Sequence, residues 1–203
     1  MYYKCSCKNS RLWQIGCIGI KVLFMKKISI FTKENILSFL YISLLLAIGR
    51  LIPHPPNFTP ILAAAIVAPY IMNNKILALL VPLSAMVIAD LFIGFYSGII
   101  WVYGSILLCG ILSENLKRFG NYKLQLGIMA IMSPILFFII TNFSVWFLYD
   151  YYPKTFEGLL LCYTMGLPFF KNTILSTLIY TGLFVVFIDF LKNTPFGLKL
   201  QKI

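Results

Sequence analysis

Six apolar stretches occupy most of the chain, and the cationic residues between them are unevenly distributed. Hydrophobic residues make up 60% of the 203 positions and charged residues only 11%, whereas a soluble domain normally carries about 25% charged residues. Lipid cannot satisfy free backbone groups, and the stretches lack the alternation of a membrane barrel, so they have to be helical. We therefore predict an all-α, polytopic membrane protein.

A helix needs roughly 20 mostly apolar residues to cross a bilayer. The segment 155–165 is too short, and we expect it to form a re-entrant or interfacial helix. On either side of the predicted membrane domain, 34–192, lie a basic N-terminal extension, 1–33, and a short basic tail, 193–203. We interpret residues 1–24 as an extension or as an upstream start that the cell does not use. The six predicted spans are 36–52, 58–72, 76–97, 99–114, 124–149 and 167–191.

The distribution of Lys and Arg predicts the orientation, because cytoplasmic loops carry an excess of these residues. With the N-terminus inside, fourteen of the seventeen cationic residues fall on the cytoplasmic side. The outer side holds Arg50, Lys154 and Lys171. The cytoplasmic side still holds most of the Lys and Arg residues when residues 1–24 are left out. We therefore expect both termini to be cytoplasmic, which agrees with an even number of spans.

Several kinds of chemistry are not expected. The net charge of +11 would suit nucleic acid, but the basic residues lie in short segments between apolar runs, as topology determinants do. The five cysteines show no metal-ligand spacing, and the chain has a single histidine. It contains no Walker A or dinucleotide glycine motif. We predict no enzymatic activity, no cofactor and no metal site, so active transport would need a partner or an ion gradient as its energy source.

Arg50 and Asp90 are charged residues within the predicted spans, where charge is costly and indicates function by default. Arg50 falls near the outer end of the first span, and Asp90 falls in the outer half of the third. They could form a structural ion pair that fixes helix packing, or they could line a ligand cavity. We favour the cavity, because other polar and aromatic residues are predicted at the same depth.

Those residues come from a proline-rich loop and from the fourth, fifth and sixth spans. An interfacial aromatic belt would explain the Trp and Tyr residues, but it does not explain Asn142, Asp90 or Arg50. Aromatic walls with a few directional polar groups are typical of a small-molecule cavity. The lone His54 lies in the same loop, either as a ligand contact or, as we favour, as an ordinary loop residue. The predicted substrate-binding residues are Arg50, Asn57, Asp90, Trp101, Tyr103, Asn142, Trp146 and Asn172.

Small residues recur at helical spacing in the first two spans. Ser43 and Ala47 are four positions apart, as are Ala64 and Ala68. Such spacing lets membrane helices approach closely, either within the protein or against a partner. We include these four residues as predicted partner contacts.

Several motifs together resemble an uncharacterised family of bacterial six-helix membrane proteins. They are Arg50 with Pro-x-Pro-Pro-Asn-Phe-Thr-Pro-Ile, Val-Pro-Leu-Ser with Asp90 and Gly94, Trp-Val-Tyr-Gly from Trp101, and Asn-Phe-Ser-Val-Trp from Asn142. That family is similar to the substrate-binding S components of energy-coupling factor transporters. The resemblance implies a six-helix bundle in the bacterial inner membrane, a substrate site near the outer surface, and docking on a transmembrane subunit that carries two ATPases. S components usually have Ala-x3-Ala in the first helix, where this chain has Ser43-x3-Ala47.

Two functions are compatible with the sequence. The first is a substrate-binding subunit for uptake of a small nutrient, such as a vitamin or its precursor, from an outward-facing pocket. The second is a membrane scaffold that assembles with other proteins and binds no small molecule, its polar groups serving as contacts between helices.

Overall fold

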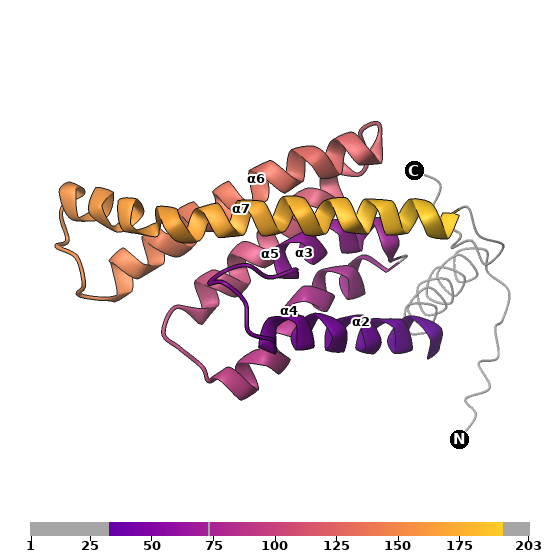
Figure 1. Ribbon diagram of the computed structural model, residues 1–203, viewed down its shortest axis with the longest axis horizontal. Helices are drawn as coiled ribbons and strands as arrows, with labels where there is room; N and C mark the ends of the chain where they lie inside the picture. The colour runs from indigo at the N-terminus through magenta and orange to yellow at the C-terminus, as the bar shows by residue number, and fades with distance from the viewer. Residues whose placement is uncertain (1–32, 73, 193–203) are drawn as a thin grey trace, which may run out of the picture. The chain divides into compact units, whose positions relative to one another are not determined.

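The computed structural model describes residues 33–72 and 74–192, and the secondary structure of this part of the chain is entirely helical. Chain contacts divide the protein into two units, Met1–Ser38 and Phe39–Ile203, and the contacts described below lie within the second. Most of the predicted N-terminal extension and the whole predicted tail lie outside the described residues. In chain order the helices are α2 (Lys33–Leu51), α3 (Ile61–Ile71), α4 (Lys75–Ile93), α5 (Ile99–Leu116), α6 (Tyr122–Leu148) and α7 (Phe156–Lys192), as Figure 1 shows.

In the part of the chain that the structure describes, four helices are long and apolar enough to cross a membrane: α4, α5, α6 and α7. The apolar part of α2, Ile36–Leu51, and the whole of α3 are shorter. With a rise of about 1.5 Å per residue, the 11 residues of α3 are well short of a hydrocarbon core about 30 Å thick. The helical prediction is confirmed, and four of the six predicted spans correspond to helices of membrane length.

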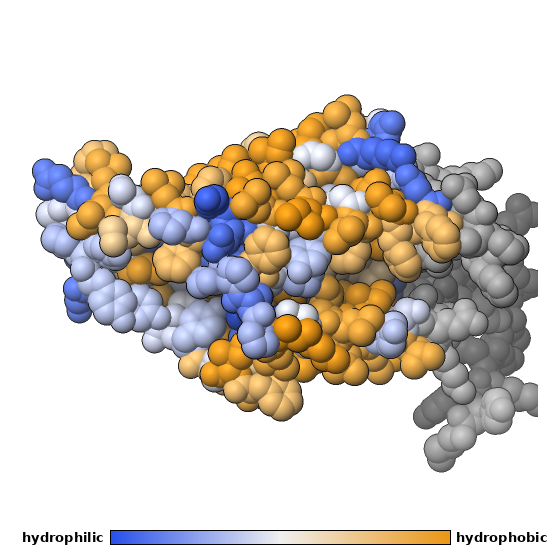
Figure 2. Space-filling view, in the orientation of Figure 1, coloured by the Kyte–Doolittle hydropathy of each residue, from blue (hydrophilic) through white to orange (hydrophobic). Residues whose placement is uncertain are grey.

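Large apolar side chains are exposed along the sides of these helices. Phe92 and Ile100 are 75% and 81% exposed, and Leu91, Leu183 and Val186 are also exposed. Figure 2 shows apolar residues covering much of the visible face, interrupted by polar patches. A soluble monomer rarely presents so much contiguous apolar surface, so this surface is consistent with a membrane protein.

Helix α3 is enclosed by the rest of the bundle. Every residue from Ile61 to Tyr70 is buried, and α3 packs against α4, α5, α6 and α7. Ala63, Ala64 and Ala65 are at most 5% exposed, because small side chains allow neighbouring helices to approach closely. Pro60 precedes the helix, where its fixed φ is favourable and its missing N–H costs no hydrogen bond.

The small residues predicted to contact a partner lie inside the chain. Ala64 is 5% exposed and Ala68 is 8% exposed. Ser43 and Ala47 on α2 are each 1% exposed, and Ser43 Oγ accepts a hydrogen bond of 2.8 Å from Ser84 Oγ on α4. The close approach that their spacing predicts is therefore intramolecular.

Helix α7 differs from the prediction of a separate interfacial helix at 155–165 followed by a span. That prediction is wrong, because the structure has one continuous helix of 37 residues with Pro168 inside it. Packing against α6 holds both sides of the proline. Cys162 Sγ donates to Asn142 O at 3.4 Å, and the Phe138 ring lies against Tyr163 on one side and Phe170 on the other. These contacts outweigh the local tendency of proline to break a helix.

In the first turn of α7, Gly158 lies so close to the backbone of Pro153 that only glycine fits there. A Cβ atom at Gly158 would lie 2.0 Å from the carbonyl oxygen of Pro153. We expect Gly158→Ala to lower the free energy of unfolding by about 1–3 kcal/mol, because backbone atoms would have to move. The measurement is thermal unfolding in detergent.

Gly182→Ala is the matched control. Gly182 lies in the same helix, and its added Cβ would meet nothing within 4 Å. This substitution should raise stability by up to about 1 kcal/mol, since alanine favours the helix. Equal stability of the two variants would contradict the close approach at Gly158.

Candidate ligand-binding site

An ion pair joins the ends of α2 and α4. Arg50 Nη2 lies 3.1 Å from Asp90 Oδ1, with the Arg50 side chain 21% exposed and the Asp90 side chain fully buried. The second carboxylate oxygen, Oδ2, accepts a 2.8 Å hydrogen bond from the hydroxyl of Tyr103 on α5. The structure thus brings together three of the predicted site residues. A buried carboxylate requires such partners, because an unpaired charge in low dielectric is costly.

A large cavity of about 510 Å³ lies beside this ion pair. Arg50, Asn57 and Asn142 contribute to its wall, together with residues of the connections at 94–98 and 149–155. Its volume is in the range of small-molecule sites, roughly 300–1,000 Å³. The full lining is Arg50, Pro56, Asn57, Tyr96, Val102, Phe137, Thr141, Asn142, Val145, Tyr152, Cys162, Met165, Gly166 and Phe169.

A small cavity of about 70 Å³ adjoins the large one and shares Arg50, Asn57, Val102 and Phe137 with it. It is large enough for a few atoms or for several waters. Arg50 and Asn57 therefore contact both spaces. The remaining lining residues are His54, Thr59, Ile61, Leu62, Met86, Ile106, Thr173 and Ser176.

The proline-rich loop at 52–60 is held against α7. Asn172 Nδ2 donates a 3.0 Å hydrogen bond to Pro56 O, and Ser176 Oγ donates to Asn57 O at 3.4 Å. Asn57 has a positive φ of 62°, a conformation that asparagine tolerates better than most residues. The predicted residue Asn172 thus positions the loop and does not line either cavity.

The two tryptophans also lie away from the cavities. Trp101 packs edge-on against Phe143, with 5.9 Å between the ring centroids. Trp146 Nε1 donates to Pro153 O at 2.9 Å, and Lys154 Nζ lies 5.9 Å from the Trp146 ring centroid. Lys154 also donates to Tyr149 O at 2.7 Å, near the end of α6. These tryptophans form contacts between helices and a loop, as an aromatic belt does.

Sequence reasoning missed several lining residues. Thr173 and Ser176 are polar residues within an apolar helix, a signal that could have been used. Gly166 lines the large cavity, and a Cβ atom there would lie 2.4 Å from Asn142 Oδ1. Partial burial raises the pKa of the Tyr96 phenol above its ordinary value, and the negative charge of Asp90 adds to the effect. Tyr96 therefore stays protonated at neutral pH and can donate a hydrogen bond into the large cavity.

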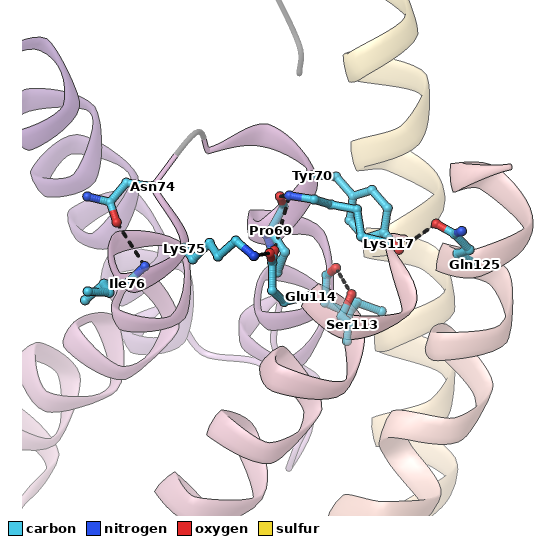
Figure 3. Close-up of polar contacts among 10 residues, drawn as sticks. Pro69, Tyr70, Asn74, Lys75, Ile76, Ser113, Glu114, Lys117 and Gln125 are labelled. Atoms are coloured by element: carbon cyan, nitrogen blue, oxygen red, sulfur yellow. Dashed lines mark hydrogen bonds and ion pairs between the residues drawn. The ribbon is translucent and has the colours of Figure 1, made fainter. Parts of the chain in front are cut away.

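A second polar network lies at the opposite ends of the helices (Figure 3). Glu114 on α5 pairs with Lys75 on α4 at 2.8 Å and with Lys117 at 3.2 Å. Lys117 Nζ also donates to Pro69 O of α3 at 2.7 Å. Nearby, the Tyr70 hydroxyl donates to Gln125 Oε1 on α6 at 3.0 Å. None of these residues lines either cavity, so the network connects four helices without forming part of the candidate site.

The arrangement defines the class of protein: the described residues are helical, with four helices of membrane length and a cavity at one end of the helices, beside a buried ion pair. The chain belongs to DUF6580, a family of unknown function, whose model matches residues 31–198. The predicted membership of an uncharacterised family is therefore confirmed. No curated protein matches the chain. No solved structure matches it either.

Proposed function

We propose that this protein is an integral membrane protein that binds a small nutrient, such as a vitamin or a vitamin precursor, as the substrate-binding subunit of an uptake system. The observation that carries this proposal is the large cavity of about 510 Å³ beside Arg50. Its wall combines aromatic and apolar side chains with a few polar groups, which is the composition of a small-molecule site. The adjoining small cavity adds a polar recess.

The charge distribution supports an outward-facing site. In our proposal α2 and α3 are the first two of six spans, with both termini in the cytoplasm. Lys75, Lys117, Arg118 and Lys123 then lie on the cytoplasmic side, at the ends of the helices opposite Arg50. This agrees with the positive-inside rule. The cavity consequently opens toward the exterior of the inner membrane, from which a nutrient would arrive.

The proposed uptake requires a partner. The sequence contains no nucleotide-binding motif, and the resemblance to S components suggests a transmembrane coupling subunit with ATPases. The exposed apolar side chains of α2, including Leu40, Tyr41 and Leu44, would face lipid or that subunit. Co-purification with ATPase subunits from a native membrane extract would support this part of the proposal.

A ligand screen tests the binding function directly. The protein in lipid nanodiscs is heated in the presence of vitamins, their precursors and a library of chemically diverse compounds. A ligand present at about 100 times its Kd should stabilise the protein by about 2.7 kcal/mol. Gly166→Leu should abolish that stabilisation, because the larger side chain would displace Asn142 and occupy the cavity. Gly182→Leu, at an open and exposed position of the same helix, should bind as the unaltered protein does.

One observation favours the alternative, a membrane scaffold without a small-molecule ligand. Arg50, Asp90 and Tyr103 bond to one another across three helices, as polar groups do when they join membrane helices. A scaffold should co-purify with a larger set of membrane proteins. It should also show no stabilisation by any compound of the screen.

A further inference from the structure

The positive charge of Arg50, which lines both cavities, restricts the chemical class of the ligand. We propose that the site binds a small organic monocarboxylate, whose carboxylate pairs with Arg50 and whose apolar body occupies the large cavity. This inference rests on the proposed function and adds the chemical class of the substrate. Among the described residues that line either cavity, Arg50 is the only Asp, Glu, Lys or Arg.

Asp90 does not offer a site for a cationic ligand. Its side chain is fully buried, and it is not part of the lining of either cavity. Both of its oxygens already accept bonds, Oδ1 from Arg50 and Oδ2 from Tyr103. An amine in the cavity would therefore meet a guanidinium and no carboxylate. Nothing would compensate the free-energy cost of removing its charge from water.

Arg50 retains unused donors. Only its Nη2 bonds to Asp90, and its Nε is buried from water without any hydrogen-bond partner. An unsatisfied buried donor costs about 1–3 kcal/mol. Because Nε is closed to water in this structure, a ligand carboxylate would reach Nε–H only after the Arg50 side chain turns toward the cavity. It could then accept from Nε–H and from an amino group of the same guanidinium through two parallel bonds, which is the geometry that arginine favours.

The two cavities match the two parts of such a molecule. The small cavity of about 70 Å³ accommodates a carboxylate, and the Asn57 and Thr59 side chains in its wall supply further polar groups. The large cavity has Phe137, Phe169 and Met165 in its wall, against which an aromatic or aliphatic body can pack. Arg50 already pairs with Asp90, so a dianion would bring the total to three negative charges at one guanidinium where a monocarboxylate brings it to two, and a single carboxylate therefore fits better than a dianion.

Three probes of matched size test the proposal: phenylacetate, phenylacetamide and phenethylamine. Their binding to the protein in nanodiscs is measured by isothermal titration calorimetry. We expect phenylacetate to bind at least about tenfold more tightly than the neutral amide, because hydrogen bonds to charged groups are stronger than neutral ones. The amine should not bind measurably.

Variants assign the preference to Arg50. The double variant Arg50→Gln, Asp90→Asn removes both charges together, so no buried charge is left unpaired. It should lose the preference of phenylacetate over phenylacetamide. Arg50→Lys retains the charge but loses the Nε–H donor. Its preference for phenylacetate over phenylacetamide should therefore lie between that of the unaltered protein and that of the double variant. Lys171→Gln removes an exposed cation of α7 and should leave the preference unchanged.

The outcomes separate this inference from the proposed function. Equal or tighter binding of the amide or the amine, or a preference for phenylacetate that persists in the double variant, would overturn the carboxylate assignment. So would failure of all three probes while neutral or cationic library compounds bind. The proposed function itself would survive each of these results, and it fails only if no compound of the full screen stabilises the protein.

Discussion

Arg50→Met should lower the free energy of unfolding by about 3–5 kcal/mol, because it leaves a fully buried carboxylate without its cation. The Tyr103 hydroxyl would still donate to Asp90, but a neutral hydrogen bond cannot replace the guanidinium. The measurement is denaturation of the purified protein in detergent, followed by circular dichroism.

The double variant Arg50→Met, Asp90→Leu provides the decisive comparison. Replacing a buried ion pair by apolar residues of similar size is often neutral or stabilising, so this variant should recover most of the lost stability. Lys171→Met removes an exposed cation from α7 and should have little effect. Single and double variants of equal stability would show that Asp90 does not depend on Arg50.

Glu114→Ala should have a comparable effect at the other end of the helices, lowering the free energy of unfolding by about 3 kcal/mol. Glu114 binds both Lys75 and Lys117, and the Lys117 side chain is only 13% exposed. Without Glu114 the Lys117 ammonium would stay largely buried and keep its bond to Pro69 O, but it would lose the carboxylate of Glu114. Glu114→Gln keeps hydrogen-bonding groups, so it should lower the free energy of unfolding by less than Glu114→Ala does.

Asp150→Ala is the control for this prediction. Asp150 also pairs with a lysine, at 3.7 Å from Lys154, but its side chain is fully exposed. Exposed ion pairs contribute little to stability, so no change in the unfolding transition is expected. A similar loss in both variants would contradict the structural importance of the Glu114 network.

Hydropathy and depth predicted part of the fold and part of the site. Helices follow from apolar length, because the backbone must satisfy its own hydrogen bonds in lipid. The sequence left a pairing of Arg50 with Asp90 as the alternative to the favoured ligand cavity, since intramembrane charges need partners. The structure contains that pair, and it places Tyr103 on the same carboxylate.

Other features depend on which side of a helix faces which neighbour. The continuity of α7 through Pro168 requires its packing on α6, which local sequence does not encode. Trp101 and Trp146, which the sequence assigned to the candidate site, contact other aromatic rings and a loop. Thr173 and Ser176 donate to backbone carbonyls and also line the small cavity; their polarity within an apolar helix was visible in the sequence, but which side of the helix faces the cavity was not.

The enclosure of α3 has a consequence for biogenesis. Ser113 and Lys117 reach its carbonyl groups from α5, and α7 covers a further side of it. Because α7 is synthesised last of the described helices, the side of α3 that α7 covers stays open until α7 has been made. The nascent protein therefore has to shield that surface temporarily, and a chain truncated after α6 should be degraded by membrane quality-control proteases.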